Sequence, residues 1–314
     1  MYASLRKLFY GRDFLSINDV TGQEIRAIID FARELKEVKR RGDPHAFCSG
    51  KTLAMIFQKP STRTRVSFEV GMYELGGYAL FLSTQDLQLG RGETIADTAR
   101  VLSRYVDGMM IRTFSQQDVE TLAAGASVPV INGLTDWEHP CQVMADLMTV
   151  REVKGRFRGL KLAYLGDGNN VCHSLLLACP RVGMDIVVAS PPGYGPHEEI
   201  IDAARAAAAG SMSKIEVITD PVEAVRGADV VVTDVWASIG KEAEHAERIR
   251  VFQPYQVNTA LTSHAKPDFI FLHCLPAHRG KEVTDEIIDG PASRVWDEAE
   301  NRLHVQKALL ALLL

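Results

Sequence analysis

The feature that most limits the fold of this chain is the regular alternation of short apolar runs with helix-like segments. Strands that are buried on both faces and separated by helices form parallel sheets with helices on both sides. The sequence therefore predicts an α/β protein with doubly wound, mainly parallel sheets. The predicted strands are 52–57, 78–82, 108–111, 128–131, 160–165, 185–189, 214–218, 229–233 and 268–272.

A segment rich in glycine and basic residues divides this pattern in two. It reads KGRFRGLK over 154–161, with four apolar runs before it and five from its end onward. At 314 residues the chain is about twice the ~150 residues of a usual domain, which also indicates two domains. We predict one domain at 1–150 and a second at 151–296, with a last helix at about 297–314 that packs back on the first.

Charge and cysteine usage exclude several classes of protein. Thirty-five Lys and Arg against 40 Asp and Glu give a net charge of −5, so no global positive field attracts nucleic acid or an anionic membrane. No apolar run approaches the roughly 18 residues of a spanning helix. Five cysteines without a Cys-x-x-Cys pair favour reduced thiols over disulfides or structural zinc. We predict a cytoplasmic protein.

Polar side chains follow six of the predicted strands, and both halves contribute. Ligands of open parallel sheets bind beyond the carboxyl ends of the strands, where loops and helix N-termini meet. The sequence therefore predicts a binding cleft between the two domains. The segments concerned are 58–65, Arg112, His139–Gln142, 166–170, Asp234 and His273–Cys274.

The segment STRTR at 61–65 has the composition of an anion site. It combines a helix-capping hydroxyl, the free amides of a helix start and two guanidinium groups, which suit a phosphate dianion. A capped surface helix with solvated arginines is the alternative. Arg112, at the end of a neighbouring strand, favours anion binding.

Two nucleotide-binding motifs are incomplete. Gly50-Lys51-Thr52 resembles the end of a P-loop, but His45 occupies the place of the required glycine. Gly166-x-Gly168 follows a strand, yet Val171 stands at the third glycine position and no acidic residue follows the strand at 185–189. A nicotinamide-dependent oxidoreductase is therefore the weaker alternative.

The histidines and cysteines do not predict a metal site. His273 and Cys274 are adjacent, and neighbours on an extended strand point to opposite faces. The spacing of His139 and Cys141 is no recognised zinc pattern. We expect buried positions for Cys141, Cys172, Cys179 and His173.

Seven motifs in order along the chain resemble the ornithine carbamoyltransferases. STRTR and HPxQ are typical of carbamoyltransferases in general, whereas HCLPA together with DVWxS points to the ornithine branch. The motifs are STRTR (61–65), QLGRGE (88–93), HPCQ (139–142), GDGNN (166–170), DVWASIG (234–240), HCLPAHRG (273–280) and EAENR (298–302).

The resemblance implies that carbamoyl phosphate binds first, in a homotrimer or a higher assembly of trimers. The phosphate is expected to contact Ser61, Thr62, Arg63, Thr64 and Arg112, with Gln88 reaching in from a neighbouring subunit. The carbamoyl group is expected to contact Thr64, Arg112, His139, Gln142, the backbone around Cys274 and Leu275, and Arg302.

The resemblance also implies that L-ornithine binds second and is carbamoylated on its side-chain amine, without cofactor or metal. Asn170, Asp234 and Ser238 are expected to hold its amino-acid end, with Ile239 against its aliphatic part. The expected catalytic residues are Arg112, His139, Asp234 and Cys274.

One position departs from the family pattern. Ile239 replaces the methionine of a Ser-Met-Gly segment, and a β-branched side chain is stiffer than methionine. Putrescine or an acylated ornithine therefore remain alternative acceptors. A non-catalytic relative that binds carbamoyl phosphate is a further alternative, which His139 and Cys274 disfavour.

Overall fold

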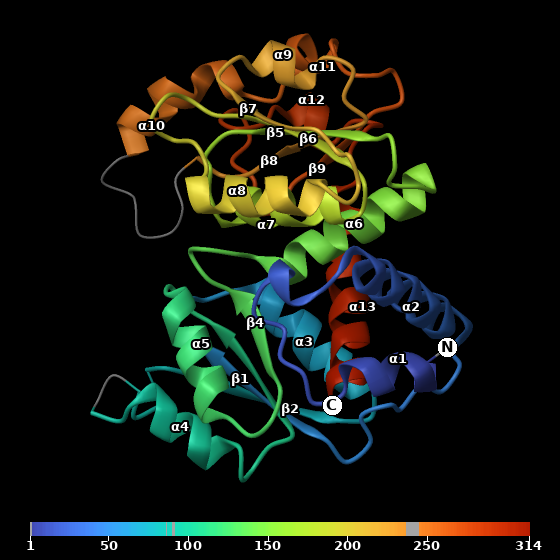
Figure 1. Cartoon of the computed structure of the whole chain (residues 1–314), viewed down its shortest axis with the longest axis vertical. Coiled ribbons are helices and arrows are strands. Elements are labelled where there is room, and N and C mark those ends of the chain that lie inside the picture. The colour runs from blue at the N-terminus through green and yellow to red at the C-terminus, as the bar shows by residue number, and fades with distance from the viewer. Residues whose placement is uncertain (1, 86, 90–91, 237–244) are drawn as a thin grey trace. The chain divides into compact units, whose positions relative to one another are not determined.

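A computed structural model describes residues 2–85, 87–89, 92–236 and 245–314. The chain forms two compact units (Figure 1). Unit 1 comprises Met1–Met148 and Glu300–Leu314, and unit 2 comprises Thr149–Ala299.

Unit 1 is built on a four-stranded sheet in the order β2-β1-β3-β4, in which every pair is parallel. The strands are β1 (Thr52–Phe57), β2 (Tyr78–Ser83), β3 (Gly108–Arg112) and β4 (Val130–Leu134). The helices are α1 (Tyr2–Phe9), α2 (Gly22–Arg41), α3 (Thr62–Glu74), α4 (Ile95–Leu102), α5 (Gln116–Gly125), most of α6 (Pro140–Lys154) and most of α13 (Val295–Leu313), with a 3₁₀ turn at Ile17–Asp19.

Helices cover both faces of this sheet (Figure 1). On one face, side chains of α4 and α5 such as Ala99 and Leu122 pack against Ile56 and Ile111. On the other lie α3 and α13, joined by an ion pair between Lys307 Nζ and Glu74 Oε2 at 2.6 Å. The sheet is thus enclosed, as expected for strands that are apolar on both sides.

Unit 2 holds a five-stranded parallel sheet in the order β7-β6-β5-β8-β9. The strands are β5 (Lys161–Leu165), β6 (Asp185–Ala189), β7 (Ile215–Ile218), β8 (Val230–Thr233) and β9 (Ile270–Leu272). The helices are α7 (Asn170–Arg181), α8 (Glu198–Ala208), α9 (Pro221–Val225), α10 (His245–Phe252), α11 (Thr259–Thr262) and α12 (Asp285–Ile288), with a 3₁₀ turn at Gln253–Tyr255. In Figure 1, α7 and α8 lie on one face, and α9, α11 and α12 on the other.

The prediction of two doubly wound, parallel sheets is confirmed. The start of α2 is fixed by a capping box, in which the side chains of Thr21 and Glu24 each accept from the other residue's backbone amide. The cysteines and the histidine expected inside, Cys141, Cys172, Cys179 and His173, are buried.

Two strands, β4 and β9, begin two residues later than predicted, for local reasons. β4 begins two residues late because Pro129 has no amide hydrogen and the Val130 amide donates to Asp13, at 2.8 Å. β9 begins at Ile270 because the preceding Phe269 amide closes a turn on Lys266, at 3.0 Å.

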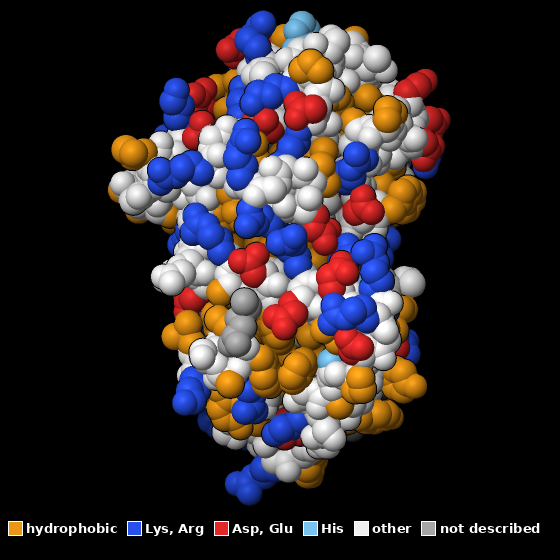
Figure 2. Space-filling view, turned by 90° about the vertical axis from the view of Figure 1, so that its right-hand side faces the viewer, with side chains coloured by type: hydrophobic (Ala, Val, Ile, Leu, Met, Phe, Trp, Pro, Cys, Tyr) orange, Lys and Arg blue, Asp and Glu red, His pale blue; other side chains and the backbone are white. Residues whose placement is uncertain are grey.

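The surface agrees with the balanced composition. Figure 2 shows Lys, Arg, Asp and Glu side chains intermixed over the displayed face. Within the described ranges, no helix is long and apolar enough to cross a membrane.

Candidate active site

The predicted anion segment begins α3, directly after β1. Ser61 is the N-cap: its Oγ accepts from the Thr64 amide at 3.2 Å and lies 3.1 Å from Thr64 Oγ1. The helix therefore begins at Thr62. The amides of its first turn lie at the carboxyl end of the sheet, where an anion is stabilised by the helix dipole.

Arg302 connects three elements of unit 1. Its Nη1 donates to Gln142 Oε1 of α6 at 2.6 Å, and its Nη2 donates to Thr64 Oγ1 of α3 at 3.2 Å. Arg302 is 3% exposed, so the guanidinium is held in a fixed place. Thr64, Gln142 and Arg302, all predicted to contact the carbamoyl group, thus form one hydrogen-bonded group. Thr64 and Arg302 are 238 positions apart in the chain.

Asp146 and Gln306 support this group, and the sequence analysis did not identify them. Gln142 Nε2 donates to Asp146 Oδ1 at 2.8 Å. With its amide oriented to satisfy both neighbours, Gln306 accepts from Arg302 Nη2 at 3.1 Å and donates to Ser67 at 2.5 Å. Gln306 and Asp146 each stand four residues after a predicted site residue on the same helix, and this spacing is the signal that could have found them.

His139 lies at the start of α6 and is 5% exposed. Burial lowers its pKa well below the ordinary value of 6.5. The positive charges of Arg302, Arg112 and Arg63 lower the pKa further, in that order. The imidazole is therefore neutral at neutral pH, and three guanidinium groups lie close enough to influence it.

The other residues predicted for the phosphate differ in exposure. Arg63 and Arg112 are half-buried, whereas Thr62 and Gln88 are exposed. Arg65 is not part of the group, because its guanidinium donates to Glu69 at 3.0 Å and stacks over the Phe81 ring.

In unit 2, the turn between β5 and α7 positions Asp234, the residue that directly follows β8. Asn169 caps α7 by accepting from the Val171 and Cys172 amides. Its Nδ2 donates to Asp234 Oδ2 at 2.7 Å. The Cys274 thiol donates to the other oxygen, Asp234 Oδ1, at 3.1 Å. Two predicted catalytic residues are therefore in direct contact, although 40 positions separate them.

His273 and Cys274 do not diverge as predicted. Asp234, His273 and Cys274 each offer one potential ligand atom, and these three atoms lie within 4.8 Å of one another. β9 ends at Leu272, so both residues follow the strand and the alternation of strand side chains does not apply. All three groups take part in hydrogen bonds, since the thiol donates to Asp234 and His273 Nδ1 accepts from the Leu275 amide at 2.9 Å.

Leu275 has a left-handed backbone, with φ of 58°, and precedes a cis proline. Its amide hydrogen is donated to His273. A contact between Leu275 and a substrate amine would therefore use the carbonyl oxygen, which is the backbone's acceptor.

The remaining predicted residues of the ornithine site are less well defined. Asn170 is the first residue of α7 and is half-buried. Ser238 and Ile239 lie outside the described residues.

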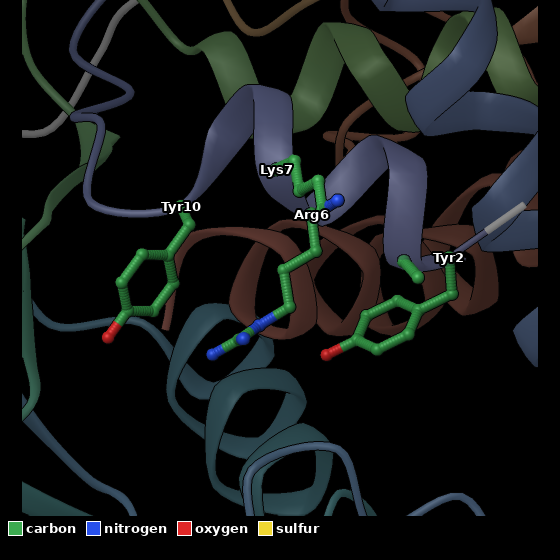
Figure 3. A pocket seen from close by; sticks show the side chains of 5 residues that line it. Tyr2, Arg6, Lys7 and Tyr10 are labelled. Atoms are coloured by element: carbon green, nitrogen blue, oxygen red, sulfur yellow. The ribbon is translucent and has the colours of Figure 1, made fainter.

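A pocket of about 510 Å³ lies at the N-terminal helix α1, lined by Tyr2, Ala3, Arg6, Lys7 and Tyr10 (Figure 3). Arg6 lies over the Tyr10 ring, 4.4 Å from its centroid, and donates to the Leu314 carbonyl at 3.2 Å. The lining contains no predicted site residue, so this pocket is separate from the groups described above.

Comparisons with known proteins match both halves of the chain. The family model described as aspartate/ornithine carbamoyltransferase, carbamoyl-P binding domain, matches residues 12–152. The model of the Asp/Orn binding domain of the same family matches residues 158–313.

Similar proteins cover almost the full length. An ornithine carbamoyltransferase of Carboxydothermus hydrogenoformans is 64% identical over 100% of both chains. An anabolic ornithine carbamoyltransferase of Pyrococcus furiosus is 60% identical over 97% of this chain and 96% of its own. A solved structure of ornithine carbamoyltransferase from Pyrococcus furiosus superposes with a TM-score of 0.95, at 60% identity, and covers 97% of each chain.

Proposed function

We propose that the chain, which belongs to the aspartate/ornithine carbamoyltransferase family, transfers the carbamoyl group of carbamoyl phosphate to the side-chain amine of L-ornithine. The products are L-citrulline and phosphate. The observation that carries the proposal is the fixed group of Thr64, Gln142 and Arg302 beside a neutral His139 whose pKa responds to three arginines. This arrangement suits a doubly negative substrate with a carbonyl group.

The phosphate of the donor binds at the start of α3. The amides of Thr62 and Arg63, the Ser61 and Thr62 hydroxyls, and the guanidinium groups of Arg63 and Arg112 supply the donors. Charge-assisted hydrogen bonds of this kind are about twice as strong as neutral ones. The support for this role is the capped start of α3 and the proximity of both arginines to His139.

Three donors serve the carbonyl oxygen, on which negative charge grows during attack. These are the Thr64 hydroxyl, the His139 imidazole and the Arg112 guanidinium. Because His139 is neutral, it donates a proton in a hydrogen bond without bringing a further positive charge. Removal of one such donor typically costs about 3 kcal/mol of transition-state stabilisation.

The nucleophile is an amine whose pKa, by analogy with lysine, is about 10.4. It must lose one proton before it attacks, and this proton passes to solvent. Asp234 accepts a hydrogen bond from the ammonium group and, with Cys274, orients it. The new bond joins the amine nitrogen to the carbamoyl carbon, and the bond from that carbon to the phosphate oxygen breaks. A second amine proton passes to the departing phosphate, which leaves as hydrogen phosphate. The substrates and side chains complete this step, so it requires no cofactor.

Asn170, Asp234 and Ser238 bind the amino-acid end of ornithine, and Ile239 borders its aliphatic part. The contact between Asn169 and Asp234 supports a fixed orientation of the acid.

The active assembly is a homotrimer, or a higher assembly of trimers, in which Gln88 serves a neighbouring subunit. The edge strand β2 supports a contact with a second copy, because Tyr78 is 64% exposed there and Tyr73 of α3 is 79% exposed. Unpaired edge strands and exposed apolar side chains are typical of protein interfaces. Gln88 itself is exposed and follows β2.

The reaction runs in the cytoplasm toward citrulline, in arginine biosynthesis. The name of the anabolic Pyrococcus furiosus relative supports this direction.

The test is colorimetric detection of the ureido product. The purified chain receives carbamoyl phosphate and, in separate reactions, ornithine, putrescine, N-acetylornithine or aspartate. We expect product with ornithine far above the other three. Product with putrescine or N-acetylornithine instead would overturn the acceptor. No product with any amine, or a change in nicotinamide absorbance, would overturn the reaction.

A further inference from the structure

Arg248 of α10 is a buried arginine outside the predicted site. It is 3% exposed, and its guanidinium donates to the Asp167 carboxylate and to the Trp236 carbonyl. The rings of Tyr194 and Phe252 lie 4.9 and 5.2 Å from it, measured to their centroids. The charge is thus paired on one side and covered by aromatic faces on another.

Removal of such a charge has a predictable local effect. A buried pair that loses one partner leaves the other charge uncompensated, which is strongly unfavourable. Asp167 is therefore expected to move toward water when Arg248 is shortened. The Trp236 carbonyl loses a charged donor at the same time.

Both hydrogen-bond partners of Arg248 named above are connected to Asp234, the acid of the proposed ornithine site. Asp167 belongs to the turn at 166–170, in which the Tyr164 hydroxyl donates to the Asp167 carbonyl at 2.9 Å and lies 3.1 Å from Asn169 Oδ1. Asn169 in turn donates to Asp234 at 2.7 Å. On the other side, Trp236 follows Asp234 by two residues in the chain.

We propose that Arg248 is a positioning residue for the amino-acid substrate. By holding the turn at 166–170 and the backbone at Trp236, it fixes Asn169 and Asp234 from both sides. The proposal rests on the proposed function, since Asp234 acts on ornithine only in that reaction. Arg248 belongs to unit 2, as do all its partners named above. Its loss therefore affects ornithine and leaves carbamoyl phosphate binding unchanged.

The experiment compares Arg248→Met with Arg250→Met, a matched control on an exposed position of the same helix. We expect the KM for ornithine to rise about ten- to hundredfold in Arg248→Met, the range that small misplacements of binding groups produce. We expect no change in the control. The Kd of carbamoyl phosphate, measured by calorimetry, stays the same in both. Arg248→Lys keeps the charge and recovers part of the ornithine KM.

Two outcomes would overturn the inference. One is an unchanged ornithine KM in Arg248→Met, and the other is an equal weakening of both substrates. Should Arg248→Met fail to fold, Asp167→Asn removes the charge of the partner with little change in volume, and the same KM shift is expected of it. Wild-type protein that makes no citrulline would contradict the proposed function instead, so the two failures are distinguishable.

Discussion

Cys274 contacts Asp234 through its thiol, and this contact defines a test at the scale of one residue. We expect Cys274→Ala to retain carbamoyl phosphate binding and to lose at least about tenfold in kcat, because the acid that orients the amine loses a donor. Calorimetry with carbamoyl phosphate and steady-state rates would measure the two effects. Cys274→Ser keeps a donor and should recover part of the rate. A kcat equal to wild type in Cys274→Ala would contradict the role.

His304 of α13 predicts how stability depends on pH. Burial lowers its pKa from 6.5 to about 4, and the Lys307 charge adds to this shift. Between these two values the unfolded chain binds a proton that the folded chain does not, so stability falls as pH falls below 6.5. The expected contribution is about 2 kcal/mol lost between pH 7 and pH 5.

Urea unfolding of wild type and His304→Gln at pH 7 and pH 5 would measure this effect. The variant is expected to lose less stability than wild type over that interval, whatever its stability at pH 7. An equal loss in both proteins would show that His304 makes no contribution. Lys307→Met should weaken the pH dependence of wild type, because it removes one cause of the lowered pKa.

Residues of the site could be predicted from the sequence where they belong to a short motif. Ser61, Thr64 and Gln142 stand in such motifs, and the structure joins the last two through Arg302. Arg248 was not predictable, because it acts through contacts with distant segments and its neighbours in the chain form ordinary helical sequence. Gln306 is different, because its spacing of four residues from Arg302 on the same helix was a usable signal.

The turn between β5 and α7 leaves no space for a side chain at Gly168. A Cβ added to Gly168 would lie 2.1 Å from the Pro196 nitrogen and 2.2 Å from the Gly195 carbonyl carbon, both backbone atoms. The backbone must therefore shift to admit a methyl group. We expect Gly168→Ala to lower the free energy of unfolding by about 1–3 kcal/mol and to raise the KM for ornithine.

Gly210→Ala is the matched control, because nothing lies within 4 Å of its added Cβ. Urea unfolding would measure the free energy of unfolding of both variants, and steady-state kinetics would measure their KM for ornithine. If Gly168→Ala matched Gly210→Ala in both measurements, the turn would not be constrained as described.

At the scale of elements, the apolar pattern predicted the existence and order of the strands better than their ends. The strands at 52–57 and 185–189 have the predicted limits, because apolar residues fill them after the first residue, Thr52 or Asp185. β4 instead continues through Asn132 and Gly133, which no apolar pattern includes. Its ladder depends on pairing with β3, a property of the folded sheet.

At the scale of the whole molecule, the proposed trimer can be tested by asking whether two subunits complete one active site. Arg63→Ala and Gln88→Ala are each expected to be nearly inactive alone. If the chain forms the proposed trimer, co-expression yields mixed trimers in which one subunit supplies Arg63 and its neighbour supplies Gln88. Random assembly then gives about one quarter of the wild-type activity.

Activity no greater than that of the separate variants would contradict a shared site. Two preparations of the same variant, mixed in the same way, provide the control. The sequence could predict this arrangement only through resemblance, since strand pattern and composition carry no information about which surface a second copy covers.

The neutral His139 beside three arginines has a consequence for the resting enzyme. The positive charges of the three arginines repel one another, and binding of a small dianion between them reduces this repulsion. Inorganic phosphate, the reaction's own product, meets the same description. The protein should therefore melt at a higher temperature in phosphate than in chloride of equal ionic strength, and product should slow turnover by competing with the carbamoyl donor.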